Sequence, residues 1–181
     1  MTETYRKMNV MTYPFLAGLH NRWTEIIFRH GGFIWGGYVR DAIAGDSPHD
    51  IDVAVSNERV QEFYSELSNL GYHEGNCHTL EPSDDLRDQG AIPIDVIEND
   101  DENHVDHLIK MSFVDFASLV DFDVNCLGYD GITLFLWTGS TMSPQRIIQS
   151  IQTRTATKMN PRPHRIEKMI AKGYQIKESP P

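Results

Sequence analysis

Two periods of hydrophobic residues run through this chain and predict a domain built from both helices and strands. Apolar residues recur at helical spacing in segments that predict helices over residues 14–29, 38–44, 57–70, 102–110, 143–159 and 162–172. Apolar runs or strict alternation predict strands over residues 33–35, 50–55, 72–79, 91–97, 122–129 and 132–137. The last two strands form a predicted hairpin, because Asp130-Gly131 between them is a strong hairpin turn signal.

Turn and cap residues separate these segments. Several glycines follow predicted helices in the C-cap position, namely Gly31-Gly32, Gly45, Gly71 and Gly173. Asn57 is placed to cap the helix that follows it, and the acidic stretch over residues 81–88 predicts a loop. The order of elements predicts a mixed α/β (α+β) fold, a mixed sheet flanked by helices, with further helices at the C-terminal end.

Length and composition favour a single soluble domain. The chain has 181 residues, of which 40% are hydrophobic and 23% charged, close to globular averages. Two cysteines, Cys77 and Cys126, exclude a disulfide framework and suit a reducing compartment. No stretch approaches the ~20 apolar residues of a membrane span. We therefore expect a cytoplasmic protein without a membrane partner.

Charge is distributed unevenly between the two ends of the chain. The net charge is −10, yet 8 of the 16 Lys and Arg residues lie in residues 146–181, against only Glu167 and Glu178. An acidic body suits cation binding, and a basic end suits contact with phosphates. This asymmetry predicts a head domain over residues 1–140 and a basic helical extension over residues 141–181 that packs on it.

Two carboxylates in the strand over residues 50–55 are the first candidates for chemistry. Successive side chains of a strand face opposite ways, so Asp50 and Asp52 share one face while Ile51 and Val53 take the other. The two acids lie roughly 6.6 Å apart along the backbone, close enough to hold a shared pair of divalent ions. Oxygen ligands of this kind prefer Mg²⁺, with Mn²⁺ as the alternative.

A glycine pair upstream strengthens this interpretation. Gly36-Gly37 joins a strand to a helix, where glycine lets the backbone approach a phosphate and the free N–H groups of the helix start bind an anion. Arg40, one turn into that helix, adds a charged donor. The spacing is not that of a dinucleotide-binding G-x-G-x-x-G motif. Strand, glycine pair, helix and Asp-x-Asp strand together predict a site for metal ions and phosphate.

A third carboxylate would complete the ligand set. Asp95 lies in the apolar segment Ala-Ile-Pro-Ile-Asp-Val-Ile, where a lone acid needs a structural or functional reason. Pro93 allows the alternative that this segment is a solvent-facing edge strand. Asp121 and Asp123 are the rival candidates for the third ligand.

These residues resemble a known family. Residues 36–45, followed by Asp50-Ile51-Asp52, look like the head domain of bacterial poly(A) polymerases and class II CCA-adding enzymes, within the polymerase-β-like nucleotidyltransferase superfamily. Residues 121–130 are similar to the family's motif Arg-Arg-Asp-Phe-Thr-Ile-Asn-Ala-Leu-Ala-Tyr-Asp, in the same order along the chain. The resemblance covers roughly residues 32–135. Stand-alone heads of this size resemble proteins of large phages and viruses, which would place the protein in a host cytoplasm.

The resemblance implies an activity and a set of site residues. It implies transfer of a nucleoside monophosphate from an NTP such as ATP to an acceptor hydroxyl, with release of pyrophosphate and with Mg²⁺ or Mn²⁺ as cofactor. It implies catalytic metal ligands at Asp50 and Asp52, to which the sequence itself adds Asp95 as the candidate third ligand. It implies nucleotide contacts at Gly36, Gly37, Asp121 and Asn125, and the charges of Arg40, Arg162 and Arg165 add these three as candidate nucleotide-binding residues.

The sequence also departs from the family pattern. The paired arginines that precede the family's Asp are replaced by Leu119-Val120, and Asp123 stands where the family has Thr. The triphosphate contacts therefore move to the basic C-terminal end or are lost. Candidates there are Arg154, Lys158, Arg162, Arg165, Lys168 and Lys172.

Three functional hypotheses remain open at this level. The acceptor is an RNA 3′ end that binds the basic residues 146–177, or it is a protein or a small molecule, as for toxin and resistance enzymes of the superfamily. The third hypothesis is a non-catalytic nucleotide-binding relic.

Overall fold

The computed structural model describes residues 5–9, 14–55, 57–76, 79–97, 120–137 and 143–179, and in them it has the predicted mixed α/β architecture. Its centre is an eight-stranded sheet with the order β1-β8-β7-β2-β3-β6-β5-β4. The strands of this sheet are β1 (Tyr5–Asn9), β2 (Phe33–Trp35), β3 (Ile51–Ala54), β4 (Tyr72–Glu74), β5 (Thr79–Pro82), β6 (Ile94–Ile97), β7 (Leu127–Tyr129) and β8 (Thr133–Trp137). Strands β9 (Thr155–Thr157) and β10 (Gln175–Lys177) form a small second sheet.

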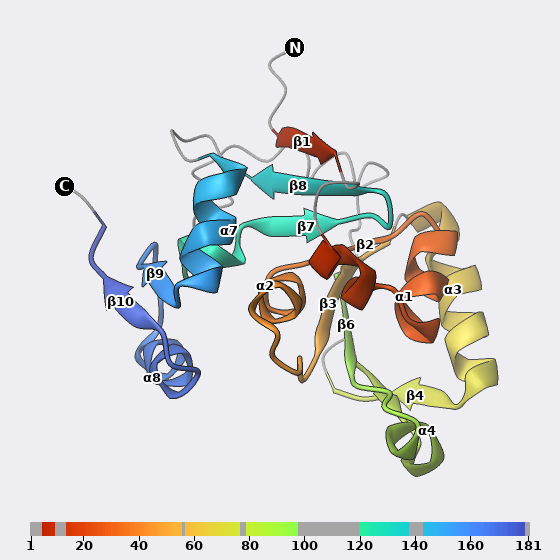
Figure 1. Cartoon of the computed structure of the whole chain (residues 1–181). Coiled ribbons are helices and arrows are strands. Elements are labelled where there is room, and N and C mark those ends of the chain that lie inside the picture. The colour runs from red at the N-terminus through yellow and green to blue at the C-terminus, as the bar shows by residue number, and fades with distance from the viewer. Residues whose placement is uncertain are drawn as a thin grey trace.

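Helices pack against the large sheet and against one another. They are α1 (Arg22–Arg29), α2 (Gly37–Ala44), α3 (Asn57–Leu70), α4 (Asp84–Asp88), α7 (Pro144–Gln152) and α8 (Pro163–Ala171), with the 3-10 turns η2 (Pro14–Leu19) and η3 (Asp123–Asn125). Helix α2 contacts β2, β3 and β7, whereas α1 contacts β2 and α3. In Figure 1 the blue C-terminal elements α8, β9 and β10 lie on the far side of α2 from α1 and α3.

One apolar core runs through the described residues. Ile34, Ile51 and Val53 from the central strands are fully buried, and Ile147 of α7 and Met169 of α8 belong to the same cluster. The C-terminal elements therefore pack on the core of the sheet. None of the described helices combines the length and the hydropathy that a bilayer crossing requires.

The helix predicted over residues 14–29 is interrupted just before α1. Asn21 is extended, and its side chain accepts hydrogen bonds from the N–H groups of Trp23 and Thr24, at 2.9 and 3.1 Å. The Thr24 hydroxyl in turn accepts from the Asn21 N–H. This capping box begins a new helix, so the preceding residues form only the short turn η2.

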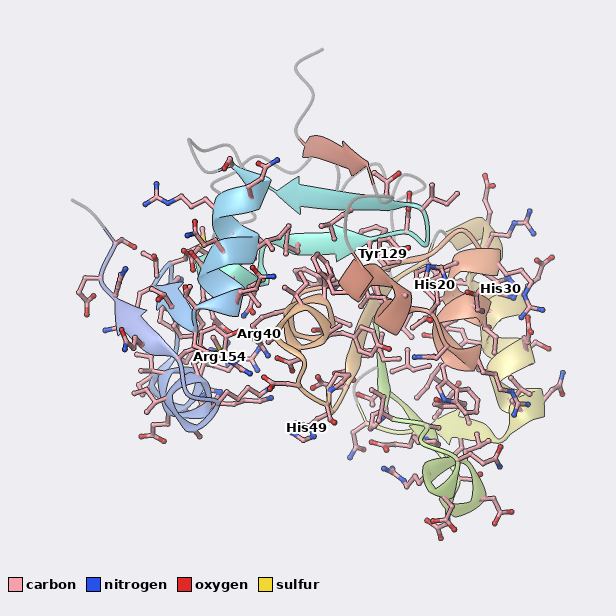
Figure 2. The ribbon with its side chains drawn as sticks, viewed as in Figure 1. His20, His30, Arg40, His49, Tyr129 and Arg154 are labelled. Carbon is pink, nitrogen blue, oxygen red and sulfur yellow. The ribbon has the colours of Figure 1, made fainter. Side chains whose placement is uncertain are left out.

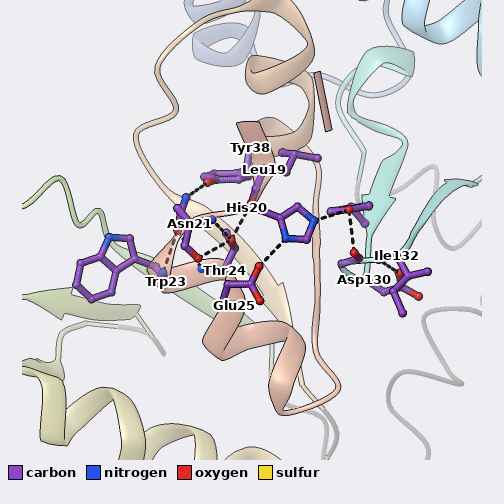
Figure 3. Close-up of polar contacts among 11 residues, drawn as sticks. Leu19, His20, Asn21, Trp23, Thr24, Glu25, Tyr38, Asp130 and Ile132 are labelled. Atoms are coloured by element: carbon purple, nitrogen blue, oxygen red, sulfur yellow. Dashed lines mark hydrogen bonds and ion pairs between the residues drawn. The ribbon is translucent and has the colours of Figure 1, made fainter. Parts of the chain in front are cut away.

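The interruption also fastens α1 to its neighbours. The His20 ring lies between Glu25 and Tyr129 of β7, with ring nitrogens 2.5 and 2.7 Å from their oxygens. Figure 3 shows the contact of His20 with Glu25 as a dashed line. The Asn21 amide donates to the hydroxyl of Tyr38 in α2 at 2.8 Å. The start of α1 is thus tied both to α2, which carries part of the candidate site, and to the central sheet.

The prediction of a loop over residues 81–88 is wrong. Glu81 and Pro82 are the last residues of β5, and the helix α4 follows, in which Leu86 is buried. The acidic residues Asp84 and Asp85 lie in the first turn of α4, where negative charge is favourable. The charge density that suggests a solvated loop thus belongs partly to a helix start.

Two predicted boundaries near the C-terminal end are also wrong. Residues 122–126 do not extend β7, because the Asp123 carboxylate accepts the N–H groups of Val124 and Thr157, both at 2.8 Å, and the chain forms η3 there. Helix α7 ends at Gln152, because Arg154 turns the chain with φ of 54° into β9. The predicted helix over residues 102–110 lies outside the described residues.

Candidate active site

A cavity of about 310 Å³ opens where β2, β3 and β6 meet the start of α2 and helix α8. Of the residues predicted as catalytic or nucleotide-binding, only Arg162 does not line it, and Arg162 is exposed at the N-cap of α8; the further candidates Asp123, Arg154 and Lys158 do not line it either. The lining residues are Trp35, Gly36, Gly37, Arg40, Asp41, Asp50, Asp52, Asp95, Val120, Asp121, Phe122, Asn125, Arg165, Lys168, Met169 and Lys172. The acids Asp50, Asp52 and Asp95 lie at or next to strands of the sheet, and the basic side chains come from α2 and from α8 and its C-cap.

The carboxylates sit in register on neighbouring strands. Asp52 of β3 pairs directly with Asp95 of the parallel strand β6, and with Trp35 of the antiparallel strand β2. Directly paired residues point to the same face of a sheet, so Asp52 and Asp95 stand side by side. Asp50 precedes β3 and lines the same cavity. The face opposite Asp52 is apolar, as the alternation predicts, with Ile51 and Val53 fully buried.

The two rivals of Asp95 have other partners. The buried Asp123 carboxylate holds two backbone N–H groups and does not line the cavity. Asp121 lines the cavity, but its carboxylate accepts a 2.6 Å hydrogen bond from Arg165. Among the three candidates for a third ligand, Asp95 is the one that pairs in register with Asp52.

The surroundings of Asp52 disfavour the ionised form of its carboxyl group. Burial first, and then the charges of Asp50 and Asp95, raise the pKa of the Asp52 carboxyl to about 7, against the lowering effect of Arg165 and Lys168. A bound cation would relieve this repulsion. Within the described residues, no three His, Cys, Asp or Glu side chains are grouped so that they could hold a metal ion by themselves. Mg²⁺ usually keeps waters and substrate phosphates among its ligands, so a site for it needs only one or two protein carboxylates.

The glycine pair forms a sharp turn between β2 and α2. Gly36 has φ of 68° and ψ of −126°, a conformation that only glycine adopts without strain. Its N–H is bonded to the Leu127 carbonyl at 2.9 Å, so this group is not free for an anion, contrary to our expectation for the pair. No side chain caps α2, however, and Gly37 at its first turn lines the cavity. The helix start at Gly37 therefore faces the space where a phosphate would bind.

Replacing Gly36 by alanine is expected to destabilise the protein by about 1–3 kcal/mol. With a Cβ at this position the backbone conformation becomes strained, and the Cβ would lie 3.4 Å from the Asp52 Oδ2 atom. Gly37→Ala is the matched control, since its Cβ would only make an ordinary contact of 3.6 Å with Arg40. Urea unfolding measures both variants. Equal stability of the two would contradict the assigned backbone strain.

Arg40 is held by internal partners. Its side chain is buried, and Nε donates to Asp41 Oδ1 at 2.7 Å while Nη1 donates to Asn125 Oδ1 at 2.6 Å. The Arg40 guanidinium therefore links α2 to η3 and orients the Asn125 amide. A contact between Arg40 and a nucleotide stays a prediction.

Asp41 is a lining residue that sequence reasoning missed. It is 2% exposed and pairs with both Arg40, at 2.5 Å, and Lys172 Nζ, at 2.5 Å. Adjacent residues of a helix do not normally face each other, so the sequence Arg40-Asp41 carried no signal of this contact. The second partner of Asp41, Lys172, lies in the C-terminal part of the chain.

Ion pairs hold much of the basic C-terminal end to the acidic body. Four of the six basic candidates pair with carboxylates. The pairs of Arg154 with Asp46, Arg165 with Asp121 and Lys172 with Asp41 join the C-terminal end to the acidic body, whereas Lys158 pairs with Glu178 within the C-terminal end. Figure 2 shows Arg40 and Arg154 on the side of α2 that faces the C-terminal elements. The basic residues of the C-terminal end thus partly serve to attach it to the rest of the domain through ion pairs.

Lys168 differs from these residues. It is exposed, lines the cavity and has no carboxylate partner among the described residues. Its charge reaches Asp52 across the cavity and lowers the pKa of that carboxyl. Arg165 and Lys168 of α8 and Lys172 at its C-cap, three and four residues apart, all line this one cavity.

No family model matches the chain, and no curated protein matches it in sequence. A complex of CCA-adding enzyme with CTP matches in structure with a TM-score of 0.61 at 17% identity, over 98% of this chain and 44% of that one. The Thermotoga maritima CCA-adding enzyme complexed with tRNA matches with a TM-score of 0.58 at 17% identity, over 99% and 44%.

Other solved structures agree. A tRNA-processing enzyme in an apo form matches with a TM-score of 0.53 at 16% identity, over 96% of this chain and 46% of that one. The chain spans less than half the length of these structures. The common part includes the β2-α2-β3 unit that carries the glycine pair and the first two carboxylates. The described part of the chain therefore shares the fold of the matching part of these CCA-adding and tRNA-processing enzymes, a mixed sheet flanked by helices.

Proposed function

We propose that this protein is a metal-dependent nucleotidyltransferase, which transfers a nucleoside monophosphate from an NTP to an acceptor hydroxyl. The observation that carries the proposal is the position of Asp52 between two further carboxylates, across one cavity from the cations of α8. Carboxylates on one wall and cations on the other match the two requirements of phosphoryl-group chemistry, metal binding and triphosphate binding.

Asp50, Asp52 and Asp95 would hold the metal. The mutual repulsion of these carboxylates, visible in the raised pKa of Asp52, is what a divalent cation neutralises. Mg²⁺ or Mn²⁺ bound there would supply Lewis-acid stabilisation of phosphate charge and a lowered pKa for a nearby hydroxyl. The three carboxylates would fix its position on strands of the central sheet, which is more rigid than a loop.

The triphosphate would lie between the start of α2 and helix α8. The N–H group of Gly37 and the positive end of the helix dipole favour a phosphate there. Lys168 supplies a cation without a competing carboxylate, and Arg165 can exchange its exposed contact with Asp121 for a phosphate oxygen. These two residues take the place of the arginine pair that Leu119-Val120 replaces.

The reaction is an in-line displacement at phosphorus. The acceptor oxygen forms a bond to the α-phosphorus, the bond from that phosphorus to the bridging oxygen breaks, and pyrophosphate leaves. The acceptor proton passes to solvent or to a carboxylate of the site. Most of the rate enhancement would come from positioning and charge stabilisation, since the protein forms no covalent intermediate.

An RNA 3′ end is the first candidate acceptor. Among the structures of the same fold, a CCA-adding enzyme is complexed with tRNA. A protein or small-molecule acceptor is the second candidate, because four of the basic residues proposed for RNA binding are paired internally. The chain also spans less than half the length of the matching structures.

Incubation with each of the four labelled NTPs, Mg²⁺ and total RNA tests the function and separates the acceptors. Label that enters RNA supports an RNA 3′ end, whereas label in protein or in a small product supports the second candidate. Asp50→Ala is the matched negative control. If no NTP transfers label to any fraction, the protein is not an enzyme of this class, and nucleotide binding would then test the non-catalytic alternative.

Removing the charge of Lys168 is expected to weaken NTP binding about tenfold, the usual effect of losing one charged hydrogen bond. Lys168→Ala deletes the unpaired cation of the cavity wall. Lys177→Ala is the control, since Lys177 is exposed on β10 and does not line the cavity. Isothermal titration with a non-hydrolysable NTP and Mg²⁺ gives both affinities. Equal affinities would remove Lys168 from the nucleotide site.

A further inference from the structure

The hydroxyl of Thr79 makes a close contact with the candidate metal site. Its Oγ1 atom donates a hydrogen bond of 2.5 Å to Asp95 Oδ1. Thr79 is the first residue of β5, and it pairs directly with Asp95 of the antiparallel strand β6. Both side chains therefore leave the same face of the sheet, the face that also carries Asp52.

These pairings form one row of residues across four adjacent strands. From β2 to β5 the row is Trp35, Asp52, Asp95 and Thr79. The acids Asp52 and Asp95 lie in the middle of this row, and Thr79, a neutral hydrogen-bond donor, lies at one end. Asp95 thus has two neighbours in the row. On one side the Thr79 hydroxyl donates a hydrogen bond to it, and on the other side lies the carboxylate of Asp52.

The hydroxyl is not needed for the backbone structure at this position. The Thr79 N–H donates to Asn76 O at 3.2 Å, and the Thr79 carbonyl accepts from the Gly75 N–H at 2.8 Å. A valine keeps the β-branched shape that strands favour and removes only the donor. The side-chain contact thus serves Asp95 rather than the strand.

A hydrogen bond to one carboxylate oxygen has a directional consequence. It fixes the rotation of the Asp95 carboxyl group and occupies Oδ1, so that Oδ2 is left as the oxygen for a cation. This hydrogen bond also stabilises the negative charge that Asp95 carries beside Asp52. Outer partners of metal ligands act in this way, and their loss typically lowers metal affinity 10–100-fold.

We propose that Thr79 is a positioning residue for the metal site, which orients the Asp95 carboxylate toward a divalent cation shared with Asp50 and Asp52. The inference rests on the proposed function, because it requires that these carboxylates bind a metal. It adds to that function a residue on a fourth strand, which makes no contact with the metal or the nucleotide itself.

Direct titration of the full chain with Mn²⁺, without nucleotide, tests this role independently of transfer activity. Thr79→Val is expected to raise the Mn²⁺ dissociation constant about tenfold. Thr79→Ser keeps the donor and is expected to stay within about twofold of the wild-type protein. Thermal unfolding in EDTA checks that the variants are folded, and Thr79→Ala replaces Thr79→Val if the latter does not fold.

The outcomes separate the inference from the function on which it rests. Wild-type affinity in both Thr79→Val and Thr79→Ser would show that the hydroxyl only ties β5 to β6, and would overturn the positioning role while leaving the metal site intact. Equal loss in both variants would also overturn it, because serine retains the hydroxyl. Failure of the wild-type protein to bind Mn²⁺ would overturn the metal site and this inference together.

Discussion

Replacing Asp52 by asparagine is expected to abolish nucleotidyl transfer and, at the same time, to stabilise the metal-free protein at neutral pH. Asp52 stands in register between Trp35 and Asp95 at the centre of the cavity wall. Asparagine has nearly the same shape but cannot supply a negative oxygen to a divalent cation. We expect the transfer rate to fall at least about a hundredfold, as for other single groups that stabilise charge in a transition state.

The stability effect follows from the pKa of the same group. Burial, with Asp50 and Asp95 nearby, raises the pKa of Asp52 from its model-compound value of 3.8 to about 7. Between these two pH values the native state holds a proton that the unfolded chain has released. The free energy of unfolding therefore falls as pH rises through this window, and the full loss is present above pH 7.

Asparagine carries no charge and escapes this loss. At pH 8 in EDTA, Asp52→Asn is expected to raise the free energy of unfolding by about 2 kcal/mol, which discounts the full shift for the partly solvated carboxyl. The difference from the wild-type protein should shrink as the pH is lowered from 7 toward 4. Urea unfolding at pH 5 and pH 8 measures it.

An exposed acid provides the control for this pair of effects. Asp88→Asn removes one exposed charge at the end of α4, outside the cavity, and is expected to change stability by less than about 0.5 kcal/mol at either pH. An Asp52→Asn variant that still transfers nucleotide, or that is less stable than the wild-type protein at pH 8, would contradict the assigned role of the carboxylate.

The second large effect is expected at Asp41. Asp41→Ala removes the carboxylate that Arg40 and Lys172 share, and leaves two cations with side chains only 6% and 16% exposed without their partner. Breaking a buried ion pair from one side typically destabilises a protein by about 3–5 kcal/mol. Urea unfolding measures the loss.

A second ion pair between the same parts of the molecule is the matched control. Asp46→Ala removes the partner of Arg154, whose side chain is 31% exposed, and is expected to cost about 1 kcal/mol. The contrast tests burial as the cause, because both changes detach one carboxylate from the basic C-terminal elements. Similar losses in the two variants would contradict the buried, unscreened character of the Asp41 cluster.

Local patterns explain why part of the candidate site could be predicted from the sequence. The turn at Gly36-Gly37 and the alternation at Asp50 and Asp52 are written in consecutive residues, and their geometry depends on neighbours in the chain. Asp95 was found through a different signal, a lone acid in an apolar strand. Its placement beside Asp52 needed the pairing of β3 with β6, which sequence spacing does not encode.

Long-range contacts explain what could not be predicted. The helix over residues 143–159 is broken because Arg154 takes a left-handed conformation and its carbonyl accepts the N–H of Gln175 at 2.7 Å. The strand over residues 122–129 starts late because Asp123 holds the Thr157 backbone. In both cases the local hydrophobic pattern is overridden by a partner from a distant segment. Thr79 escaped notice for the same reason.

The row that joins Trp35, Asp52, Asp95 and Thr79 has a consequence for how this protein acquires its activity. Successive residues of a strand alternate between faces, so a slip of β6 by one residue would turn Asp95 to the opposite side of the sheet and bring an apolar neighbour into its place. A misregistered chain would still look folded by its helix and strand content, yet it would lack one of the proposed metal ligands. The metal affinity that we propose for this molecule would thus also measure correct strand assembly, and it would report on folding fidelity where spectroscopy of secondary structure cannot.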